Sequence, residues 1–497
     1  MKGWMKMFEK ITPEKAGISS NNVLSFLKTL EKRGLCTHSI LLMKGEDIFA
    51  EFYWKPFHKD FNHRMYSQTK SYEAIAIGLL EEEGKLKLDD KMSEHFPEKY
   101  DRELPEYLRE QTICEMLTMT TVGHPENWFK ASEPDRTRLY FESNDSKRPA
   151  GTIWEYDSAG SQVLSSLCEK LSGKSLLDYL KEKLFNRMGT FQNAEILKTR
   201  NGDSWGDSAL LCTPRDMASF GRLLMNGGKW QGESLINEAF VKEATSALVC
   251  NNKFGFSEGY SWGYGYQIWG LPDGGFSFNG MGAQLTLCHP SKDLIFVITS
   301  DNQGYSGAKD NILTAFYDHI FDNIGEELPE DKEALEELTR FGEALKLRAF
   351  EGRKETSFSR ELSGNKYVCL ENPMGISEFG FDFSEEEALF RYKNAQGEKE
   401  MKIGINKNLF GKFPQLGYSN DVGGARTDDG FMYDCAFSGA FVEDKKFAFR
   451  AQIIDRYFGN LFVVAAFKDD YCVLKMAKTA EDFLEEYDGI AVGKLLK

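Results

Sequence analysis

The chain has 497 residues, 41% of them hydrophobic and 28% charged, which is typical of a globular protein with two or three domains. Its net charge of −16 argues against nucleic acid or an anionic membrane as a partner, because like charges repel at short range. The nine cysteines are an odd number without a C-x-x-C pair, and most lie in apolar runs, which indicates reduced thiols rather than a disulfide framework.

The N-terminal part of the chain predicts a helix followed by a hairpin. Residues 1–10 have no apolar core of signal-peptide length, and no apolar run is long enough to span a membrane, so we expect a cytoplasmic location. Apolar residues at helical spacing predict a helix at about 20–33. Two strand-like runs, 38–43 and 47–54, flank Lys44-Gly45-Glu46, a sequence typical of a hairpin turn.

The next predicted helix begins near Ser67, ends near Gly84, and has a serine and a lysine three residues apart at its start. Positions i and i+3 share one helix face, about 5–6 Å apart at Cβ, so Ser67 and Lys70 could touch. A lysine desolvated beside the apolar run that follows would have a lowered pKa and could act as a base. A base beside a serine is what activates a hydroxyl as a nucleophile.

A mixture of helices and strands follows this segment. Between about 85 and 210, short helices alternate with long polar connections, so we predict a helical insertion. Beyond it the sequence predicts, in order, a helix at 214–228, strands at 283–289 and 293–299, and a helix at about 307–323.

The chain changes character in its last third. Charged residues and leucines at helical spacing predict a linker helix over 331–356, which would follow a first domain at 1–330. From 357 to 497, short alternating runs divided by Gly, Asn and Asp predict an antiparallel β barrel or sandwich.

Two further segments hold residue types suited to chemistry at a serine. Tyr156 lies on a loop just before an amphipathic helix, where a phenol near an ammonium can lose or relay a proton. The alternative is that Tyr156 only packs the loop. At 275–285 small residues open a strand, and their glycines permit a close backbone approach that could offer an N–H to an oxyanion. The alternative there is an ordinary strand entry with a bulge.

Several segments occur in an order and spacing that is specific when they are taken together. They are Glu14–Ile18, Tyr66–Ser71, Gly78–Asp90, Leu117–Thr121, Thr213–Leu224 and Gly263–Tyr266. Through them the chain resembles, over about residues 10–325, the class-C-like esterase and amidase branch of the serine β-lactamase and penicillin-binding-protein superfamily. The resemblance implies an α+β fold, an α/β/α sandwich on an antiparallel sheet with a helical subdomain, to which the C-terminal β domain is added.

The resemblance also implies roles for individual residues. Ser67 would form the acyl-enzyme, Lys70 would activate it as a base, and Tyr156 would carry a proton to or from the leaving group. The N–H groups of Ser67 and of Met281, which follows Gly280 in the third motif, would hold the oxyanion. The substrate would be a small ester or amide, and no cofactor is implied.

The chain departs from the family pattern at two places. The second motif reads Tyr156-Asp157-Ser158 where Tyr-x-Asn is usual, so Ser158 would face the substrate. The third motif begins with Asn279 where Lys or His is usual. Without a cation there, a substrate carboxylate lacks a fixed partner, which argues against β-lactams and D-Ala-D-Ala peptides. An uncharged third motif resembles esterases and aminohexanoate-oligomer amidases of the branch, and favours uncharged esters and amides.

Several other patterns point elsewhere, and we discount them. A second Ser-x-x-Lys copy, Ser363–Lys366, runs into a strand-like segment, and a second tyrosine motif, Tyr418–Asn420, has no helix after it. Gly202–Gly206 fits G-x-S-x-G but lacks the preceding strand and the following helix of a nucleophile elbow. The seven histidines show no H-x-H or H-x-x-x-H spacing, so we expect no metal site.

Two other functions stay open. One is a penicillin-binding-protein-like D-amino-acid peptidase or weak β-lactamase. The other is a ligand-binding or sensor protein without turnover, against which the presence of Ser67, Lys70 and Tyr156 argues. The C-terminal β domain could bind a ligand in a lipocalin-like barrel, or could be a stabilising or dimer-forming accessory. The oligomeric state is not determined by the sequence.

Overall fold

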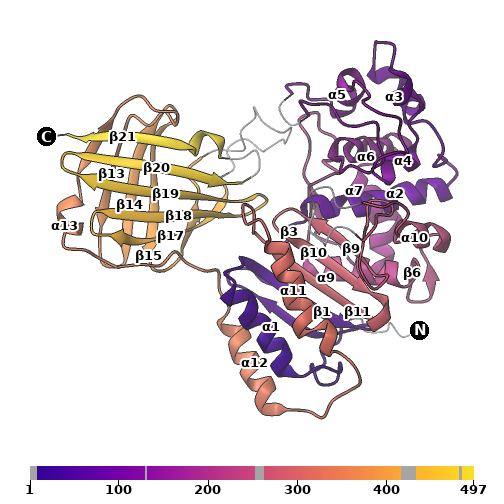
Figure 1. Ribbon diagram of the computed structural model, residues 1–497, viewed down its shortest axis with the longest axis horizontal. Helices are drawn as coiled ribbons and strands as arrows, with labels where there is room; N and C mark the ends of the chain where they lie inside the picture. The colour runs from indigo at the N-terminus through magenta and orange to yellow at the C-terminus, as the bar shows by residue number, and fades with distance from the viewer. Residues whose placement is uncertain (1–7, 129–130, 252–261, 416–431, 481–483, 497) are drawn as a thin grey trace. The chain divides into compact units, whose positions relative to one another are not determined.

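The computed structural model describes residues 8–128, 131–251, 262–415, 432–480 and 484–496 (Figure 1). The Tyr418–Asn420 motif lies outside these ranges. The chain divides into two compact units, the first ending at Lys346 and the second beginning at Leu347. No helix in the described part of the chain is both long enough and apolar enough to cross a lipid bilayer.

Among the described residues, the first unit is built on six antiparallel strands. They are β1 (Thr37–Lys44), β2 (Asp47–Tyr53), β8 (Trp269–Gly270), β9 (Phe276–Gly280), β10 (Gln284–His289) and β11 (Leu294–Ser300). In the sheet they lie in the order β2-β1-β11-β10-β9-β8. Successive side chains of β1 alternate between two cores, because Leu41 and Met43 enter one while Ile40 and Leu42 enter the other.

Helices cover both faces of this sheet (Figure 1), so β10 and β11 are buried along their whole length. The helices α1 (Ser20–Lys32), α11 (Ala308–His319) and α12 (Lys332–Ala344) share one core with the sheet. The helices α2 (Thr69–Glu82) and α9 (Pro214–Met225) share the other. The predicted α/β/α sandwich with an antiparallel sheet is confirmed.

Short helices between α2 and α9 form the expected helical subdomain, in which α6 (Ser158–Ser172) packs against α2. A small sheet of β3 (His63–Arg64), β5 (Leu210–Cys212) and β4 (Glu195–Ile196) ties the segment before Ser67 to the chain beyond residue 206. The remaining elements of the first unit are α3 Glu106–Glu110, α4 Ile113–Leu117, α5 Arg136–Ser143, α7 Leu176–Leu180, α8 Asn186–Met188, β6 Lys229–Trp230, β7 Glu233–Ser234 and α10 Glu238–Ala244.

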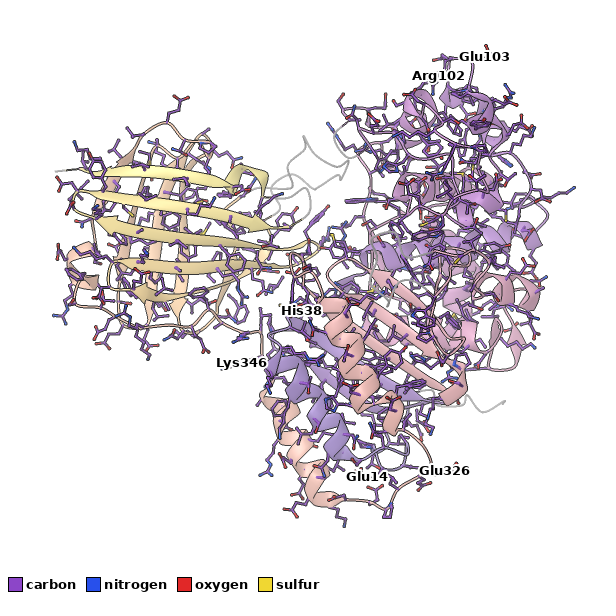
Figure 2. The ribbon with its side chains drawn as sticks, viewed as in Figure 1. Glu14, His38, Arg102, Glu103, Glu326 and Lys346 are labelled. Carbon is purple, nitrogen blue, oxygen red and sulfur yellow. The ribbon has the colours of Figure 1, made fainter. Side chains whose placement is uncertain are left out.

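The Glu14–Ile18 segment has a structural role at the start of α1. The carboxylate of Glu14, which Figure 2 labels, is buried. It accepts hydrogen bonds from the backbone N–H and the hydroxyl of Ser20, at 2.6 and 3.0 Å. Gly17 has φ +86°, and a Cβ there would lie 2.1 Å from the carbonyl oxygen of Gly325. Only glycine therefore lets these two backbone segments approach each other.

The helix after residue 330 is shorter than the predicted linker over 331–356. Helix α12 ends at Ala344, and its buried residues include Leu338 in the core shared with α1. A Cβ at Gly342 would lie 2.2 Å from the ring of Phe52, so this glycine allows α12 to pack closely on β2. Beyond the helix the chain is extended, since Lys346 forms a β bridge with Lys55. The spacing of the leucines predicted a longer helix because Leu345 and Leu347 fit the helical pattern. Both are buried, but they lie in the extended segment after the helix.

The second unit is a closed β barrel preceded by a short helix, α13 (Ser359–Leu362). Nine strands of the described part of the chain close the barrel through a parallel pairing of β15 with β17, and β16 adds to β17. The predicted all-β domain is confirmed, in its barrel form. The strands are β12 Lys366–Cys369, β13 Glu378–Phe383, β14 Glu387–Asn394, β15 Gly397–Ile405, β16 Leu409–Lys412, β17 Asp434–Glu443, β18 Lys446–Ile454, β19 Phe458–Lys468, β20 Tyr471–Thr479 and β21 Gly489–Leu495.

Aromatic rings fill the middle of the barrel. Phe381 stacks on Phe390 with ring centres 4.7 Å apart, and its ring also meets those of Phe447 and Phe467 at 6.0 Å. All four side chains are buried. These four rings form part of the barrel's own core.

Candidate active site

The segment with Ser67 enters α2 through a tight turn. Tyr66, Ser67 and Gln68 form a short 3₁₀ turn, and Tyr66 adopts φ +49°, a left-handed conformation that is rare for a bulky residue. The turn is held from outside, because the N–H of Met65 donates to the carbonyl of Leu210 at 2.8 Å. Ser67 is partly exposed, while Tyr66 and Gln68 on either side are buried. The nucleophile candidate is therefore fixed in position but accessible.

Lys70 contacts Ser67 as its sequence spacing predicts. The amine of Lys70 donates to Ser67 Oγ at 3.0 Å and to the carbonyl oxygen of Asp207 at 2.6 Å. Its side chain is 1% exposed, and its Nζ lies 3.7 Å from Asp207 Oδ2. A buried amine with these acceptors is held in a single orientation, with its nitrogen against the serine oxygen.

The predicted lowering of the Lys70 pKa is wrong. Burial lowers the pKa of the amine, but Tyr156 and the carboxyl of Asp207 raise it by more than burial lowers it. The pKa of Lys70 therefore lies above its ordinary value of 10.5. The apolar run after Lys70 correctly predicts burial. What it does not reveal is the pair of groups, from distant parts of the chain, that favour the ammonium.

Tyr156 lies where the sequence places it, on the loop that enters α6. Its ring stacks on Trp269 with centres 5.7 Å apart, and Lys70 Nζ lies 5.2 Å from the ring centre. The neighbouring Asp157 caps α6, since its carboxylate accepts from the N–H of Gly160 at 3.0 Å and from the hydroxyl of Thr121 at 2.8 Å. Ser158 is the first residue of α6 and is partly exposed.

The third-motif segment lies directly against the nucleophile turn. A Cβ on Gly280 would lie 2.1 Å from the carbonyl oxygen of Met65, so only glycine permits this approach of β9. Met281 follows in the turn, with 38% of its side chain exposed, and its carbonyl accepts from the side chain of Gln284 at 3.0 Å. The structure thus brings Gly280 next to the Ser67 turn.

Asn279 has a partner that the sequence reasoning missed. With its nitrogen donating to Ser277 Oγ and to the carbonyl of Phe278, its side-chain oxygen accepts from Lys309 Nζ at 2.9 Å. Lys309 comes from α11 and is 8% exposed. One signal was available in the sequence, because Lys309 falls at helical spacing with Ile312 and Phe316 on a face that is otherwise apolar.

Asp207 was also missed, although it directly follows the G-x-S-x-G pattern. Its loop is clamped to the nucleophile turn by Arg64, whose guanidinium lies 4.4 Å from the ring centre of Tyr66 and 4.6 Å from that of Trp205. Ser204 within the pattern is 1% exposed and is followed by turns rather than a helix. The segment is therefore not a nucleophile elbow. It positions Asp207, whose carbonyl oxygen accepts a hydrogen bond from Lys70.

Glu73 is a buried acid one helical turn beyond Lys70. Its side chain is 0% exposed, and within the described residues neither carboxyl oxygen has a hydrogen-bond partner. Burial and the nearby Asp207 raise the pKa of Glu73 well above 4.5, against the opposing effect of Lys70. Both causes favour the protonated form of this carboxyl group over the charged form.

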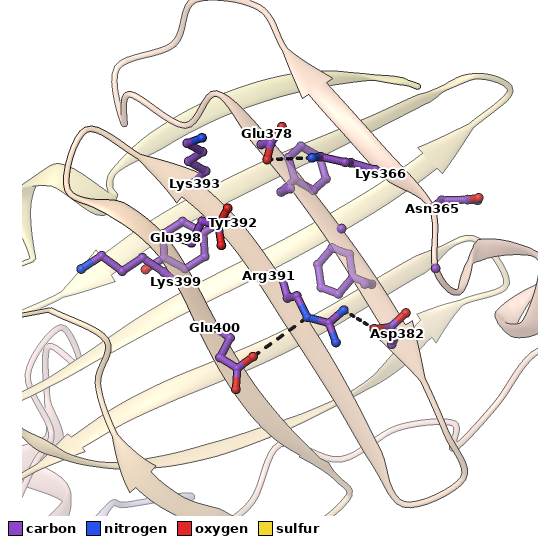
Figure 3. A pocket seen from close by; sticks show the side chains of 14 residues that line it. Asn365, Lys366, Glu378, Asp382, Arg391, Tyr392, Lys393, Glu398, Lys399 and Glu400 are labelled. Atoms are coloured by element: carbon purple, nitrogen blue, oxygen red, sulfur yellow. Dashed lines mark hydrogen bonds and ion pairs between the residues drawn. The ribbon is translucent and has the colours of Figure 1, made fainter. Parts of the chain in front are cut away.

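The second Ser-x-x-Lys copy lies in the barrel unit. Ser363 follows α13 and Lys366 begins β12, so the two do not share a helix. Figure 3 shows Lys366 beside a pocket of about 410 Å³ on the outer side of β12 to β15, where it pairs with Glu378 at 2.8 Å. Arg391 pairs with Asp382 in the same pocket. Paired surface charges of this kind offer no activated nucleophile.

Among the described residues, no group of three or more His, Cys, Asp and Glu side chains is arranged to hold a metal ion. The chain is 24% identical over 328 residues to the 6-aminohexanoate-dimer hydrolase of Paenarthrobacter ureafaciens, a match that covers 61% of this chain and 84% of that protein.

Two solved structures share the fold. EstCE1, a hydrolase with promiscuous acyltransferase activity, matches with a TM-score of 0.51 at 15% identity, over 60% of this chain and 99% of that one. A penicillin-binding-protein homologue from Caulobacter crescentus matches with a TM-score of 0.50 at 15% identity, over 61% and 99%. The β-lactamase family model matches residues 31–318, more than half of the chain. The chain belongs to the β-lactamase family and is a hydrolase of β-lactamase fold.

Proposed function

We propose that this protein is a serine hydrolase that forms an acyl-enzyme on Ser67 and acts on small esters or amides. The observation that carries the proposal is the 3.0 Å contact between Lys70 Nζ and Ser67 Oγ, with the ring of Tyr156 beside the same amine. A weakly nucleophilic hydroxyl needs a positioned base, and Lys70 is the group in reach. The curated relative is named a 6-aminohexanoate-dimer hydrolase, which supports an amide among the substrates.

In the proposed acylation, Lys70 first releases its ammonium proton to solvent, and its neutral amine then accepts the proton of Ser67 as Oγ attacks the substrate carbonyl carbon. The carbonyl oxygen becomes an oxyanion that accepts hydrogen bonds from the N–H groups of Ser67 and Met281. The bond to the leaving group then breaks, and Tyr156 delivers a proton to the departing oxygen or nitrogen. A water molecule releases the acyl group by the same steps in reverse, and Ser67 recovers its proton.

The test is intact-mass measurement after incubation with p-nitrophenyl acetate or with a fluorophosphonate. We expect one covalent adduct on the wild-type chain and none on Ser67→Ala. An adduct that persists on Ser67→Ala would remove Ser67 as the nucleophile. If neither chain is labelled and neither hydrolyses esters or amides, the ligand-binding or sensor function would be favoured instead.

A further inference from the structure

Four neighbouring strands form one outer side of the barrel. They are β12, β21, β20 and β19 in sheet order, and Figure 1 shows the last three side by side. Every second residue of these strands is buried inside the barrel, so the residues between them point outward. We call this outward set the lysine face. It consists of the even-numbered residues of 366–370, 462–468 and 490–494 and the odd-numbered residues of 471–477.

The lysine face carries one sign of charge in an acidic chain. Its members are apolar residues and four lysines, and none is acidic, although the whole chain has 77 Asp and Glu against 61 Lys and Arg. The neighbouring strands β13 to β15 differ, because Arg391 there pairs with both Asp382 and Glu400 (Figure 3). Opposite charges compensate each other on those strands, as on an ordinary solvated surface, whereas the lysine face has no acids of its own.

Cross-strand pairing arranges the lysine face in rows. The middle row is apolar throughout, because Val473 of β20 lies opposite Val492 of β21 on one side and Ala466 of β19 on the other. Leu370 extends the row to β12, since its N–H donates to the carbonyl of Val492 at 3.0 Å. Its side chain is 67% exposed. Contiguous exposed apolar side chains of this kind are typical of an interaction surface.

The rows on either side of the apolar row hold lysines. Lys494 lies opposite Tyr471 in one row, and Lys475 lies opposite Ile490 in the other. Both lysines are exposed, and neither forms an ion pair with a residue that the structure describes. Four residues along β20 separate the two rows, which corresponds to about 13 Å. That separation is close to the width of an α-helix with its side chains, about 10–12 Å.

We propose that the lysine face binds an acidic amphipathic helix of a partner protein. Apolar side chains of the helix would cover the apolar row, and Asp or Glu side chains on its two flanks would pair with Lys494 and Lys475. The inference goes beyond the proposed function, because the face belongs to the second unit and uses no residue of the Ser67 site.

Charge complementarity selects this occupant over two others. In a two-fold pair of lysine faces, lysines would oppose lysines, which argues against a second copy of the chain. An anionic membrane would meet the molecule as a wide charged plane, and the net charge of −16 opposes that approach. A single helix interacts only with charges within a Debye length of about 8–10 Å, and on this face those charges are lysines.

The probe is a fluorescein-labelled synthetic helix whose leucines, at i, i+3 and i+4 spacing, are flanked by glutamates. A matched peptide has lysine in place of every glutamate. Binding to the full chain is measured by fluorescence anisotropy at low and high salt. The test variants are Lys475→Glu combined with Lys494→Glu, and Leu370→Ser. The matched control is Lys393→Glu combined with Lys402→Glu, which reverses two exposed lysines on β14 and β15.

We expect the acidic peptide to bind, less tightly at high salt, and the lysine peptide not to bind. Reversal of Lys475 and Lys494 should raise Kd about tenfold or more, because two attractive contacts become repulsive. Leu370→Ser should also raise Kd, and the control should stay within about twofold of wild type. Equal binding of the two peptides, or an unchanged Kd after reversal of Lys475 and Lys494, would overturn the proposal.

The other two occupants have their own readouts. Cosedimentation with vesicles of phosphatidylcholine and phosphatidylserine, without binding of the acidic peptide, would identify a membrane as the occupant. A mass by light scattering that rises with concentration in wild type, but not after reversal of Lys475 and Lys494, would identify a second copy. Either result, or a failure of the acidic peptide to bind, overturns the proposal.

Discussion

Two opposing requirements meet at Lys70. The amine touches Ser67 Oγ, as a general base must, yet its surroundings hold its pKa above 10.5 and so favour the ammonium. An ammonium cannot accept the serine proton. The reactive form of the proposed site is therefore a minor one at neutral pH, and its population grows as the pH rises.

This balance predicts the pH dependence of the reaction. Because the pKa of Lys70 is raised, the fraction of neutral amine should increase about tenfold for each pH unit below that pKa. We expect kcat/KM for p-nitrophenyl acetate to rise steadily from pH 7 to pH 10, after subtraction of the rate with Ser67→Ala. A flat profile, or turnover at pH 7–8 that survives in Lys70→Ala, would contradict the assignment of Lys70 as the base.

Glu73 gives a second prediction at this scale, on stability. Its pKa is higher in the folded chain than in the unfolded chain, so the folded state binds the extra proton and is stabilised below about pH 4.5. That stabilisation is lost as the pH rises towards the folded-state pKa. Glu73→Gln removes this pH-dependent loss, because the amide has nearly the same shape and does not ionise in this range.

We therefore expect Glu73→Gln to gain stability relative to wild type between pH 5 and pH 8. The gain is measured by thermal unfolding of both chains at both pH values. Glu82→Gln, an exposed position on the same helix, is the control and should show no such trend. An equal effect of Glu73→Gln at both pH values would mean that Glu73 titrates normally.

At the scale of elements, the approach of β9 to the nucleophile turn depends on one glycine. A Cβ at position 280 would lie 2.1 Å from the Met65 carbonyl oxygen. Because that oxygen belongs to the backbone, no rotation of a side chain can relieve the contact. Either the strand or the turn must shift by roughly 1 Å to relieve such a contact, which would misplace the Met281 N–H relative to Ser67.

Gly280→Ala should therefore lower kcat/KM for ester hydrolysis about 100-fold, as the removal of one oxyanion donor does. The cost in stability should be about 1–3 kcal/mol, as for other overpacked sites. Gly325→Ala is the control, because a Cβ there meets no atom within 4 Å. Activity within twofold of wild type in Gly280→Ala would show that β9 does not position an oxyanion donor.

The same elements show what can be predicted from the sequence. Ser67 with Lys70, and Tyr156 before α6, were predictable because each depends on local spacing along one segment. The contact of Asp207 with Lys70 and that of Lys309 with Asn279 were not predictable, because each joins residues that are distant in the sequence. The raised pKa of Lys70 follows from such long-range neighbours, and so local burial alone gave the wrong direction.

At the scale of the whole molecule, the change of unit at residues 346 and 347 coincides with a change of partners. Lys346 forms a β bridge with Lys55 in the first unit. Leu347, by contrast, accepts a hydrogen bond at its carbonyl from Asn408, and Phe350 N–H donates to Ser438 Oγ, both at 2.8 Å. Each unit has its own core, since the three hydrophobic clusters described in the first unit include no residue of the barrel.

Separate cores predict that the first unit folds without the barrel. A chain that ends at Lys346 keeps α12 packed on α1, both faces of the six-stranded sheet and every residue of the proposed Ser67 site. We expect it to unfold cooperatively and to form the fluorophosphonate adduct, with Ser67→Ala in the shortened chain as the control. A shortened chain without a cooperative transition would show that the first unit depends on the second for its stability. A shortened chain that unfolds cooperatively but is not labelled would instead assign the second unit a part in forming the reactive site, since the core would then be intact and only the chemistry lost.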